Sequence, residues 1–260
     1  MKKPLIFVTN DDGSKAKGFN LLIEALRPFG RIVAVVPSEG RSGMSQAFTM
    51  SAPLFLNKIR DEEDVQIYEC SGTPVDCVKL SFDYMFTGEK PDLNVSGINH
   101  GSNAAVNVLY SGTMGAAIEA SFYKIPTVGL SLCSHDPDAD FDVAIDFTRR
   151  LIPTLLAMEK RDAEPFCLNI NVPVGRPEQI LGHKVCRQTR GYWREVFEKR
   201  YDPRGREYFW LTGSFINWEP EAEDTDEWAL ANGYIAIVPV RVDMTNYEQS
   251  PFVERMLAGL

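Results

Sequence analysis

The sequence lacks several features that would assign it to a common class at once. It has no apolar run near the roughly 18 residues that a membrane-spanning helix needs. Only about four apolar residues follow Met1-Lys2-Lys3-Pro4, which is fewer than the core of a signal peptide requires. Its five cysteines include no Cys-x-x-Cys pair, so structural zinc and disulfides are not expected. These absences predict a cytoplasmic protein with reduced thiols and no membrane contact.

A positive balance of charge is also missing. The chain has 27 Lys and Arg residues against 36 Asp and Glu residues, for a formal net charge of -9. Because nucleic acids are bound mainly by cationic side chains that neutralise phosphates, we expect no nucleic acid polymer as a partner. A small anionic substrate would need a local positive centre, and a bound metal ion would be such a centre.

What is present is a regular alternation of short apolar runs with helical periodicity. At 260 residues with 44% hydrophobic side chains, the chain is long enough for one large core. The alternation predicts an α/β fold with a mainly parallel, doubly wound sheet. We expect strands at 5–9, 31–36, 65–70, 93–96, 127–132, 166–172 and 234–238. We expect helices at 19–26, from Pro74 with Thr73 as N-cap, at 114–122, at 141–155 with a possible kink at Pro153, and after Thr225.

The C-terminal part differs from the rest of the sequence in composition and in hydrophobic pattern. Aromatic-rich segments at 192–199 and 206–211 flank Asp202-Pro203-Arg204-Gly205, a hairpin signal. A long hairpin cannot bury two aromatic faces by itself, so we expect it to pack on a neighbouring subunit, with packing on its own domain as the alternative. The chain is thus predicted to be a single domain, 1–260, made of an α/β core at 1–175 and a C-terminal hairpin with a closing strand and helix at 176–260.

Two adjacent carboxylates, Asp11 and Asp12, follow the first predicted strand. Two like charges in a partly buried crevice need a counter-charge, because repulsion and desolvation otherwise favour protonation of one of them. The run Thr9-Asn10-Asp11-Asp12-Gly13 therefore has two interpretations. It is a divalent metal site, or it is a polar Asx-type turn with Gly13 at positive φ.

Three further loops are expected to converge on the same edge of the sheet, where ligands bind in open α/β folds. One carries Ser42, whose hydroxyl is a candidate metal ligand, although an ordinary surface turn is the alternative. A second carries Asn99, whose carbonyl oxygen suits a hard cation. The third, 110–113, opens a helix whose N-terminus is a plausible phosphate cradle.

Taken in order, the motifs resemble the SurE family, the survival-protein nucleotidases that remove phosphate from nucleoside monophosphates with a divalent metal. The resemblance covers nearly the whole chain. The motifs that carry it are Thr9-Asn10-Asp11-Asp12-Gly13, Arg41-Ser42-Gly43, Gly72-Thr73-Pro74-Val75-Asp76-Cys77, Ser96-Gly97-Ile98-Asn99-His100-Gly101, Tyr110-Ser111-Gly112-Thr113, Thr225-Asp226 and Gly233-Tyr234.

The resemblance implies a Rossmann-like three-layer core, a small-molecule nucleotide substrate and one divalent cation per subunit. It also implies a homodimer or homotetramer that exchanges the hairpin. The implied metal ligands are Asp11, Asp12, Ser42 and Asn99, and the implied phosphate contacts are Asn99, Ser111, Gly112 and Thr113. Three departures leave substrate preference open: Ser14 in place of an aromatic residue, Ala104-Ala105 in place of a glycine-rich spelling, and Pro37-Ser38-Glu39 without an Asp after the proline.

The expected chemistry is hydrolysis of a phosphate monoester, with Asp11 and Asp12 as catalytic residues. One metal can serve as Lewis acid and template, and oxygen ligands favour magnesium or manganese. Attack by an oriented water and attack by an Asp carboxylate both remain open. His100 is a candidate proton donor to the leaving group or a residue with only a structural hydrogen bond. The alternatives to a nucleotidase are a phosphatase for another small phosphate ester or short polyphosphate, and a nucleotide-binding regulatory protein.

Overall fold

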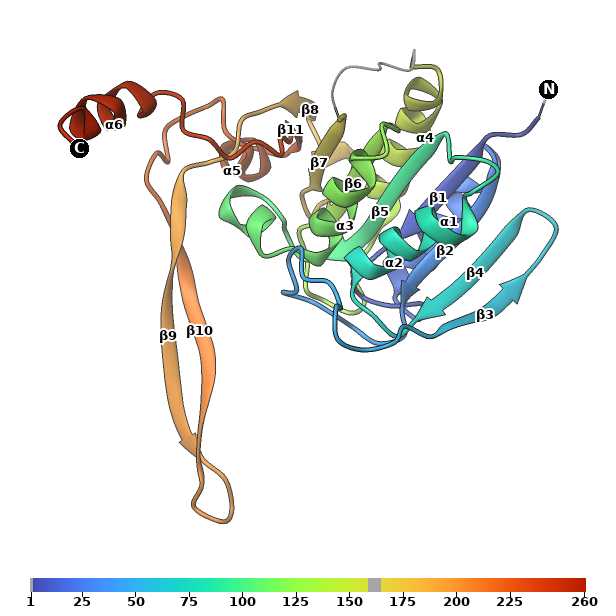
Figure 1. Cartoon of the computed structure of the whole chain (residues 1–260), viewed down its shortest axis with the longest axis horizontal. Coiled ribbons are helices and arrows are strands. Elements are labelled where there is room, and N and C mark those ends of the chain that lie inside the picture. Colours follow the sequence, from blue (N-terminus) through green and yellow to red (C-terminus); the bar gives the residue numbers. More distant parts are fainter. Residues whose placement is uncertain (1, 159–164) are drawn as a thin grey trace.

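A nine-stranded, mostly parallel sheet forms the centre of the molecule (Figure 1). The computed structural model describes residues 2–158 and 165–260. The strands of the sheet lie in the order β3-β4-β2-β1-β5-β6-β7-β11-β8. Their bounds are β1 Leu5–Thr9, β2 Arg31–Pro37, β3 Leu56–Asp61, β4 Val65–Cys70, β5 Leu93–His100, β6 Thr127–Leu132, β7 Cys167–Val172, β8 Gly182–Val185 and β11 Tyr234–Pro239.

Helices cover both faces of this sheet, which makes the core three-layered. The longer helices are α1 Lys17–Leu26, α2 Pro74–Leu80, α3 Gly112–Ser121, α4 Asp142–Leu156, α5 Asp226–Ala231 and α6 Ser250–Leu257. Short turns of helix are η1 Ser81–Met85, η2 Ala105–Leu109 and η3 Pro177–Gln179. Successive side chains of a strand point to opposite faces, and β1 shows the result. Ile6 and Val8 pack in the cluster that contains α1 and α4, whereas Leu5 and Phe7 pack in the cluster with α2 and α3.

The order of the strands reverses beside β1. The chain proceeds from β1 through β2 to β4 on one side, and then from β5 through β6 to β7 on the other. β1 pairs in parallel with both β2 and β5, with Thr9 opposite Ser96. In open α/β sheets, ligands bind outside the carboxyl ends of the strands at such a switch point. The fold therefore places the end of β1, and with it Asp11 and Asp12, at the position that this architecture uses for ligands.

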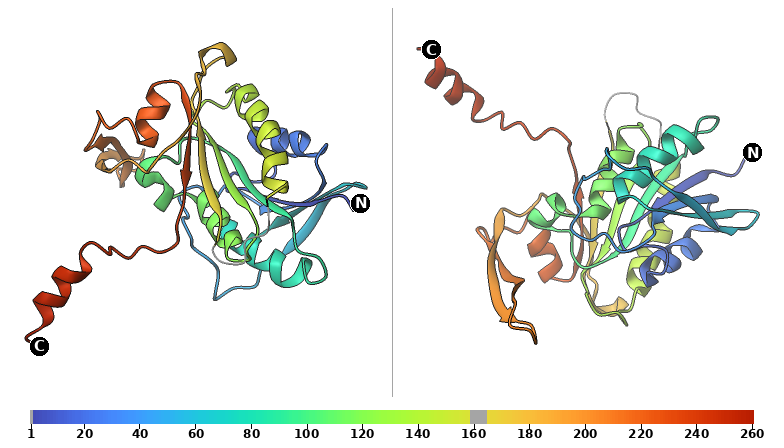
Figure 2. Two further views of the ribbon diagram at one scale, coloured as in Figure 1. Left: turned by 90° about the horizontal axis from the view of Figure 1, so that it is seen from above. Right: turned by 60° about the horizontal axis from the view of Figure 1, so that its bottom comes forward.

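A hairpin in the C-terminal part projects from the core. β9 (Gly191–Tyr201) and β10 (Glu207–Asn217) form a separate antiparallel ribbon that extends away from the sheet (Figure 1). Most side chains of this ribbon are exposed, among them Phe197, Phe209 and Trp210. Helix α6 lies at the end of an extended segment, away from the core (Figure 2). Among the described residues, no helix has both the length and the apolar character needed to cross a bilayer.

The predicted fold class is confirmed. One departure lies at the site, because β5 continues through Asn99 to His100, where the sequence predicted a loop after residue 96. The other departures lie at the periphery. The sheet is parallel except that β3 pairs antiparallel with β4 and β11 pairs antiparallel with β7. Pro153 lies within α4 and the helix runs through it, so the expected boundary of that element extends to Leu156. β3, β8 and α6 were not predicted. All three are largely exposed, so their sequences carry little of the apolar periodicity that marks a buried element.

Candidate active site

The turn after β1 is closed by two hydrogen bonds of the Asn10 side chain. The Asn10 side-chain nitrogen donates to the Gly13 carbonyl at 2.9 Å, and the Gly13 N–H donates to the Asn10 side-chain oxygen at 3.1 Å. Gly13 has φ of +86°, a conformation that glycine adopts without strain. A polar turn closed by an Asn side chain is therefore present, and Asn10 forms it. Asp11 and Asp12 are left with side chains that the turn does not use, so the turn and a metal site are compatible.

Asp11 is buried and is held by the start of α3. Its side chain is only 3% exposed, and the Thr113 hydroxyl donates to Asp11 Oδ1 at 2.5 Å. Gly112 also packs against Asp11, because a Cβ added to that residue would lie only 2.8 Å from Asp11 Cβ. The structure thus brings two of the predicted phosphate contacts against the first carboxylate. For Thr113, the contact seen is with Asp11, and phosphate binding by this residue stays a prediction.

The Ser42 loop is bonded to the main chain of Asp11, not to its carboxylate. The Arg41 N–H donates to the Asp11 carbonyl at 2.7 Å, so Ser42, which is exposed, follows directly after a residue bonded to the acidic turn. The Arg41 side chain pairs with Glu39 at 2.7 Å. The loop is also tied to the segment before α3, where Ser45 donates from its N–H to the Tyr110 carbonyl at 3.1 Å.

The end of β5 meets the second carboxylate. The His100 N–H donates to Asp12 Oδ2 at 3.3 Å. Asn99 is buried, and its side-chain nitrogen donates to the Gly101 carbonyl at 2.7 Å, which fixes the orientation of the amide and leaves its oxygen as the candidate ligand atom. The His100 ring lies 4.9 Å from that of Phe141, edge to face. The contact of His100 with Asp12 is thus made by its main chain, and proton donation by the imidazole stays untested.

Burial dominates the electrostatics of the acidic pair. Desolvation raises the pKa of Asp11 to about 6, against the lowering effect of the Thr113 hydrogen bond, and the charge of Asp12 raises it further. Desolvation also raises the pKa of Asp12, while the His100 hydrogen bond and charge lower it. Within residues 2–158 and 165–260, neither carboxylate takes part in an ion pair. A cation at this position would supply the missing charge.

The donor set fits a hard cation better than a soft one. It comprises two carboxylates, one hydroxyl and one amide oxygen, from Asp11, Asp12, Ser42 and Asn99, and such oxygens suit magnesium or manganese. In the part of the chain that the structure describes, no group of three or more His, Cys, Asp or Glu side chains has an arrangement that could hold a metal ion. This agrees with a site in which only two of four candidate donors are acidic.

Asp76 supports the Ser42 loop as well as its own helix. It forms a capping box with Thr73 at the start of α2, as its position in the sequence predicts. It also accepts hydrogen bonds from the Thr49 N–H at 2.8 Å and the Thr49 hydroxyl at 2.7 Å. Burial raises the pKa of Asp76, but these bonds outweigh burial and the net pKa is lowered. Asp76 is therefore ionised, and its hydrogen bonds to Thr49 hold the C-terminal end of the segment that carries Ser42.

Asp226 performs a comparable task for the loop after Asn99. It is buried, and its Oδ2 accepts from the Ala105 N–H at 2.8 Å. Its Oδ1 accepts from the Thr189 N–H at 2.9 Å and the Thr189 hydroxyl at 2.6 Å. Asp226 belongs to one of the motifs that carry the family resemblance, and that resemblance assigns it no role at the site. The contact with Ala105 joins residues 121 positions apart, so no local pattern predicts it.

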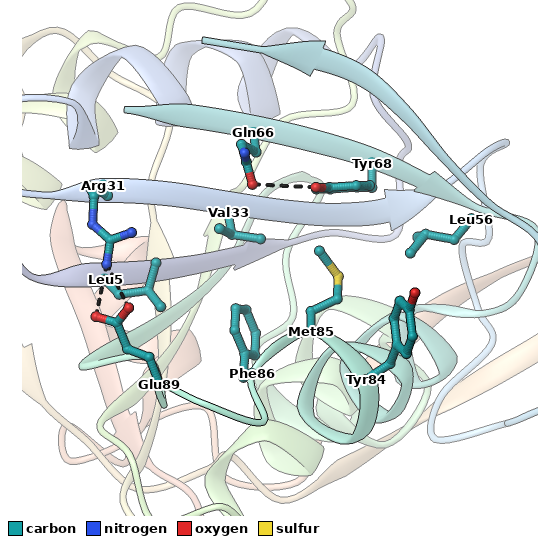
Figure 3. A pocket seen from close by; sticks show the side chains of 10 residues that line it. All are labelled: Leu5, Arg31, Val33, Leu56, Gln66, Tyr68, Tyr84, Met85, Phe86 and Glu89. Carbon is teal, nitrogen blue, oxygen red and sulfur yellow. Dashed lines mark hydrogen bonds and ion pairs between the residues drawn. The ribbon is translucent and has the colours of Figure 1, made fainter. Parts of the chain in front are cut away.

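A hollow of about 420 Å³ lies elsewhere, and no residue of the four converging loops lines it (Figure 3). It lies on the face of the sheet that packs on α2 and η1, and Leu5 and Arg31, the first residues of β1 and β2, contribute to it. Its charged side chains, Arg31 and Glu89, bind each other at 2.8 and 2.9 Å, and the Tyr68 hydroxyl donates to Gln66. Its two charged side chains neutralise each other, whereas the acidic pair of the turn has no ion-pair partner among the described residues, so the turn remains the better candidate for catalysis.

Comparisons with known proteins agree on one family. The model of the family described as Survival protein SurE matches residues 6–195. A 5′-nucleotidase SurE of Phocaeicola vulgatus is 47% identical over 246 residues, covering 95% of this chain and 94% of the relative. A 5′-nucleotidase SurE of Flavobacterium psychrophilum is 48% identical, covering 94% of each. The crystal structure of the SurE protein from Aquifex aeolicus superposes with a TM-score of 0.81 at 34% identity, covering 97% of this chain and 99% of that one.

Proposed function

The chain belongs to the SurE family of survival proteins, and from that premise we propose that it is a 5′-nucleotidase that hydrolyses nucleoside monophosphates to nucleoside and phosphate. The observation that carries the proposal is the convergence of three loops on one unneutralised acidic pair. The Thr113 hydroxyl contacts the Asp11 carboxylate, the Arg41 N–H contacts the Asp11 main-chain carbonyl, and the His100 N–H contacts the Asp12 carboxylate. A phosphomonoester needs such a meeting of a cation site with hydrogen-bond donors.

The cation would be held by Asp11, Asp12, Ser42 and Asn99, one per subunit, with magnesium or manganese as the preferred ions. When bound, it supplies Lewis-acid stabilisation of charge on the phosphoryl oxygens. The chain's own part is to fix the ligands: Thr113 orients Asp11, and the Gly101 carbonyl orients the amide of Asn99. Ligands that are held in place before substrate arrives lose little entropy on binding.

The N-terminus of α3 is the proposed phosphate site, with Asn99, Ser111, Gly112 and Thr113 around it. The Ser111 hydroxyl accepts from the Met114 N–H at 3.0 Å, so Ser111 caps the helix. The first N–H groups of a helix lack acceptors within the helix, and its dipole favours an anion there. Because Gly112 has no side chain, the start of α3 packs directly against Asp11.

Asp12 is the carboxylate that faces the substrate in this proposal. It is half-buried, whereas Asp11 is buried, so Asp12 is better placed to orient the attacking water and accept its proton. Attack by the carboxylate itself would instead form an aspartyl phosphate. Hydroxylamine traps an acyl phosphate, so a trapped adduct would favour the second route.

The proposal is tested by phosphate release from a panel of nucleoside 5′- and 3′-monophosphates, other phosphate esters and short polyphosphates. Each reaction is run with magnesium, with manganese and with chelator, for the wild type and Asp12→Asn. We expect metal-dependent release from nucleoside monophosphates and its loss in the variant. Preferred release from another ester would reassign the substrate, whereas no release from any compound would favour a binding protein.

The C-terminal hairpin is proposed to join subunits into a homodimer or homotetramer. Its exposed aromatic side chains form an apolar surface of a kind that marks protein interfaces. We further propose that 1–260 acts as one domain, because β8 and β11 from the C-terminal part join the sheet of the core. Light scattering after gel filtration would measure the subunit number. A monomer at micromolar concentration would contradict the assembly.

The protein is proposed to work in the cytoplasm. All five cysteines are free thiols, and burial raises the pKa of Cys133 and of Cys167 to about 12. Reduced thiols are typical of a reducing compartment. Cell fractionation with an antibody against the protein would test this location.

A further inference from the structure

One contact joins the projecting hairpin to the core beside the proposed phosphate site. The indole N–H of Trp193 on β9 donates to the side-chain oxygen of Asn107 in η2 at 2.6 Å. Trp193 is half-buried, whereas most of the hairpin beyond it is exposed, and its ring packs 6.2 Å from that of Phe215 on β10. The base of the hairpin is thus fixed to η2, the element directly before Tyr110-Ser111-Gly112-Thr113.

Asn107 connects three parts of the molecule through hydrogen bonds of its side chain and its main-chain carbonyl. Its side-chain oxygen accepts from Trp193, and its side-chain nitrogen donates to the carbonyl of Ser102, in the loop after Asn99, at 3.2 Å. Its main-chain carbonyl accepts from the N–H of Tyr110 and of Ser111, each at 3.0 Å. The last of these bonds fixes the N-cap residue of α3. The orientation of Asn107 therefore bears on both the Asn99 loop and the start of the phosphate-binding helix.

We propose that Trp193 and Asn107 form a positioning pair, through which the base of the hairpin holds the phosphate-binding N-terminus of α3 in place. Asn107 has a planar amide, so the bond from Trp193 also sets the direction of the nitrogen that donates to Ser102. Without the indole N–H, the amide can rotate, and the constraint on Ser102 and on the turn leading to Ser111 is weakened. The inference rests on the proposed function, because it assigns the start of α3 to phosphate.

The effect is expected in substrate binding more than in turnover. Neither residue is placed against the reacting atoms, and the N-terminus of α3 would bind phosphate in the ground state and in the transition state alike. Loss of such uniform binding raises KM and leaves kcat nearly unchanged. One neutral hydrogen bond corresponds to a change of roughly threefold to tenfold in KM.

The test compares Trp193→Phe with Trp210→Phe, a matched change of an exposed tryptophan on the same hairpin. Binding of inorganic phosphate in magnesium buffer is measured by calorimetry, beside KM and kcat for a nucleoside monophosphate. Trp193→Phe is expected to weaken phosphate binding and raise KM by about threefold to tenfold, with kcat within about twofold. Trp210→Phe is expected to change none of these quantities.

A double-mutant cycle with Asn107→Ala separates positioning from a general loss of stability. If Trp193 acts through Asn107, Trp193→Phe adds nothing to phosphate affinity in the Asn107→Ala background. Additive effects, equal effects of the two tryptophan changes, or unchanged phosphate affinity in Trp193→Phe would overturn the inference. Subunit number and the thermal midpoint are measured for every variant. Phosphate binding needs no turnover. A wild type that binds phosphate but cleaves no nucleotide would therefore refute the proposed nucleotidase activity, while the comparison of phosphate affinities would still test the role of Trp193 and Asn107.

Discussion

The core and the hairpin contain the same kind of side chain in opposite environments. In the core, the rings of Phe7, Phe82 and Phe86 contact one another edge to face, with centroids 5.3 to 5.8 Å apart, and all three are buried. On the hairpin, Phe209 and Trp210 are 55% and 57% exposed. The core buries its apolar surface within one chain. The hairpin leaves its own apolar surface exposed to solvent. The contribution of that surface to stability therefore depends on whether another protein surface packs against it.

The candidate site belongs to both regions. It consists of the turns after β1 and β2, the C-terminal end of β5 and the N-terminus of α3, which are all elements of the core. Two of its supports come from the C-terminal part, namely Asp226, which binds the Ala105 N–H, and Trp193, which binds Asn107. A change in the C-terminal part is thus able to affect the site without touching a candidate ligand.

Phe7→Ala is expected to lower the free energy of unfolding by about 4 kcal/mol, because it removes a buried ring and leaves a cavity. Chemical denaturation monitored by circular dichroism would measure the loss. The subunit number is expected to stay that of the wild type under native conditions. A loss below 1 kcal/mol would mean that the core collapses around the cavity.

Asp11→Asn is expected to stabilise the metal-free protein by up to about 3 kcal/mol at pH 7, from the difference between a pKa of about 6 when folded and 3.8 when unfolded. A raised carboxyl pKa means that the native state binds more protons than the unfolded state between about pH 4 and 6. Stability of the wild type therefore falls as pH rises through that range, and the advantage of the variant grows.

Urea unfolding in chelator at pH 4 and pH 7 would measure this difference. Saturating magnesium should reverse its sign if Asp11 is a ligand, because the ion stabilises only the wild type strongly. The same stability for wild type and variant at both pH values would contradict an unneutralised Asp11.

Gly112→Ala is expected to lower kcat/KM about a hundredfold, because misplacement of a site by about 1 Å has effects of that size. The new Cβ would lie 2.8 Å from Asp11 Cβ and 2.9 Å from Asp11 Oδ2, so the carboxylate or the helix must move. Gly40→Ala is the matched control, since no atom lies within 4 Å of a Cβ there. Equal kinetics for the two variants would show that the close approach of Gly112 to Asp11 has no part in catalysis.

Phe209→Ala is expected to change the unfolding free energy of a dilute, dissociated subunit by less than about 1 kcal/mol, since this ring is exposed on its own chain. In concentrated solution, it should weaken subunit association. Sedimentation over a range of concentrations would measure the dissociation constant. An unchanged constant would indicate that this face of the hairpin lies outside the interface.

The sequence predicts the core and the acidic turn because both are encoded locally. Strand β1 is an apolar run, and Asn10 and Gly13 are the residue types that form an Asx turn at its end. The periphery could not be predicted in this way. The residues of β3 read Leu-Asn-Lys-Ile-Arg-Asp, with charged side chains on an exposed edge. The supports of the site were missed for another reason, because Asp226 and Trp193 act across 121 and 86 positions of the chain.

The order of these elements along the chain has a consequence for how the protein is made. All candidate metal ligands and phosphate contacts have been synthesised once residue 113 is added. Asp226 is added 113 residues later. At bacterial or eukaryotic rates of synthesis, that interval is on the order of ten seconds. At the start of this interval, the nascent chain already carries the acidic turn but lacks Thr189, Trp193 and Asp226. Competence to bind the ion is thus expected to arise after synthesis of the C-terminal part, when the last support reaches Ala105.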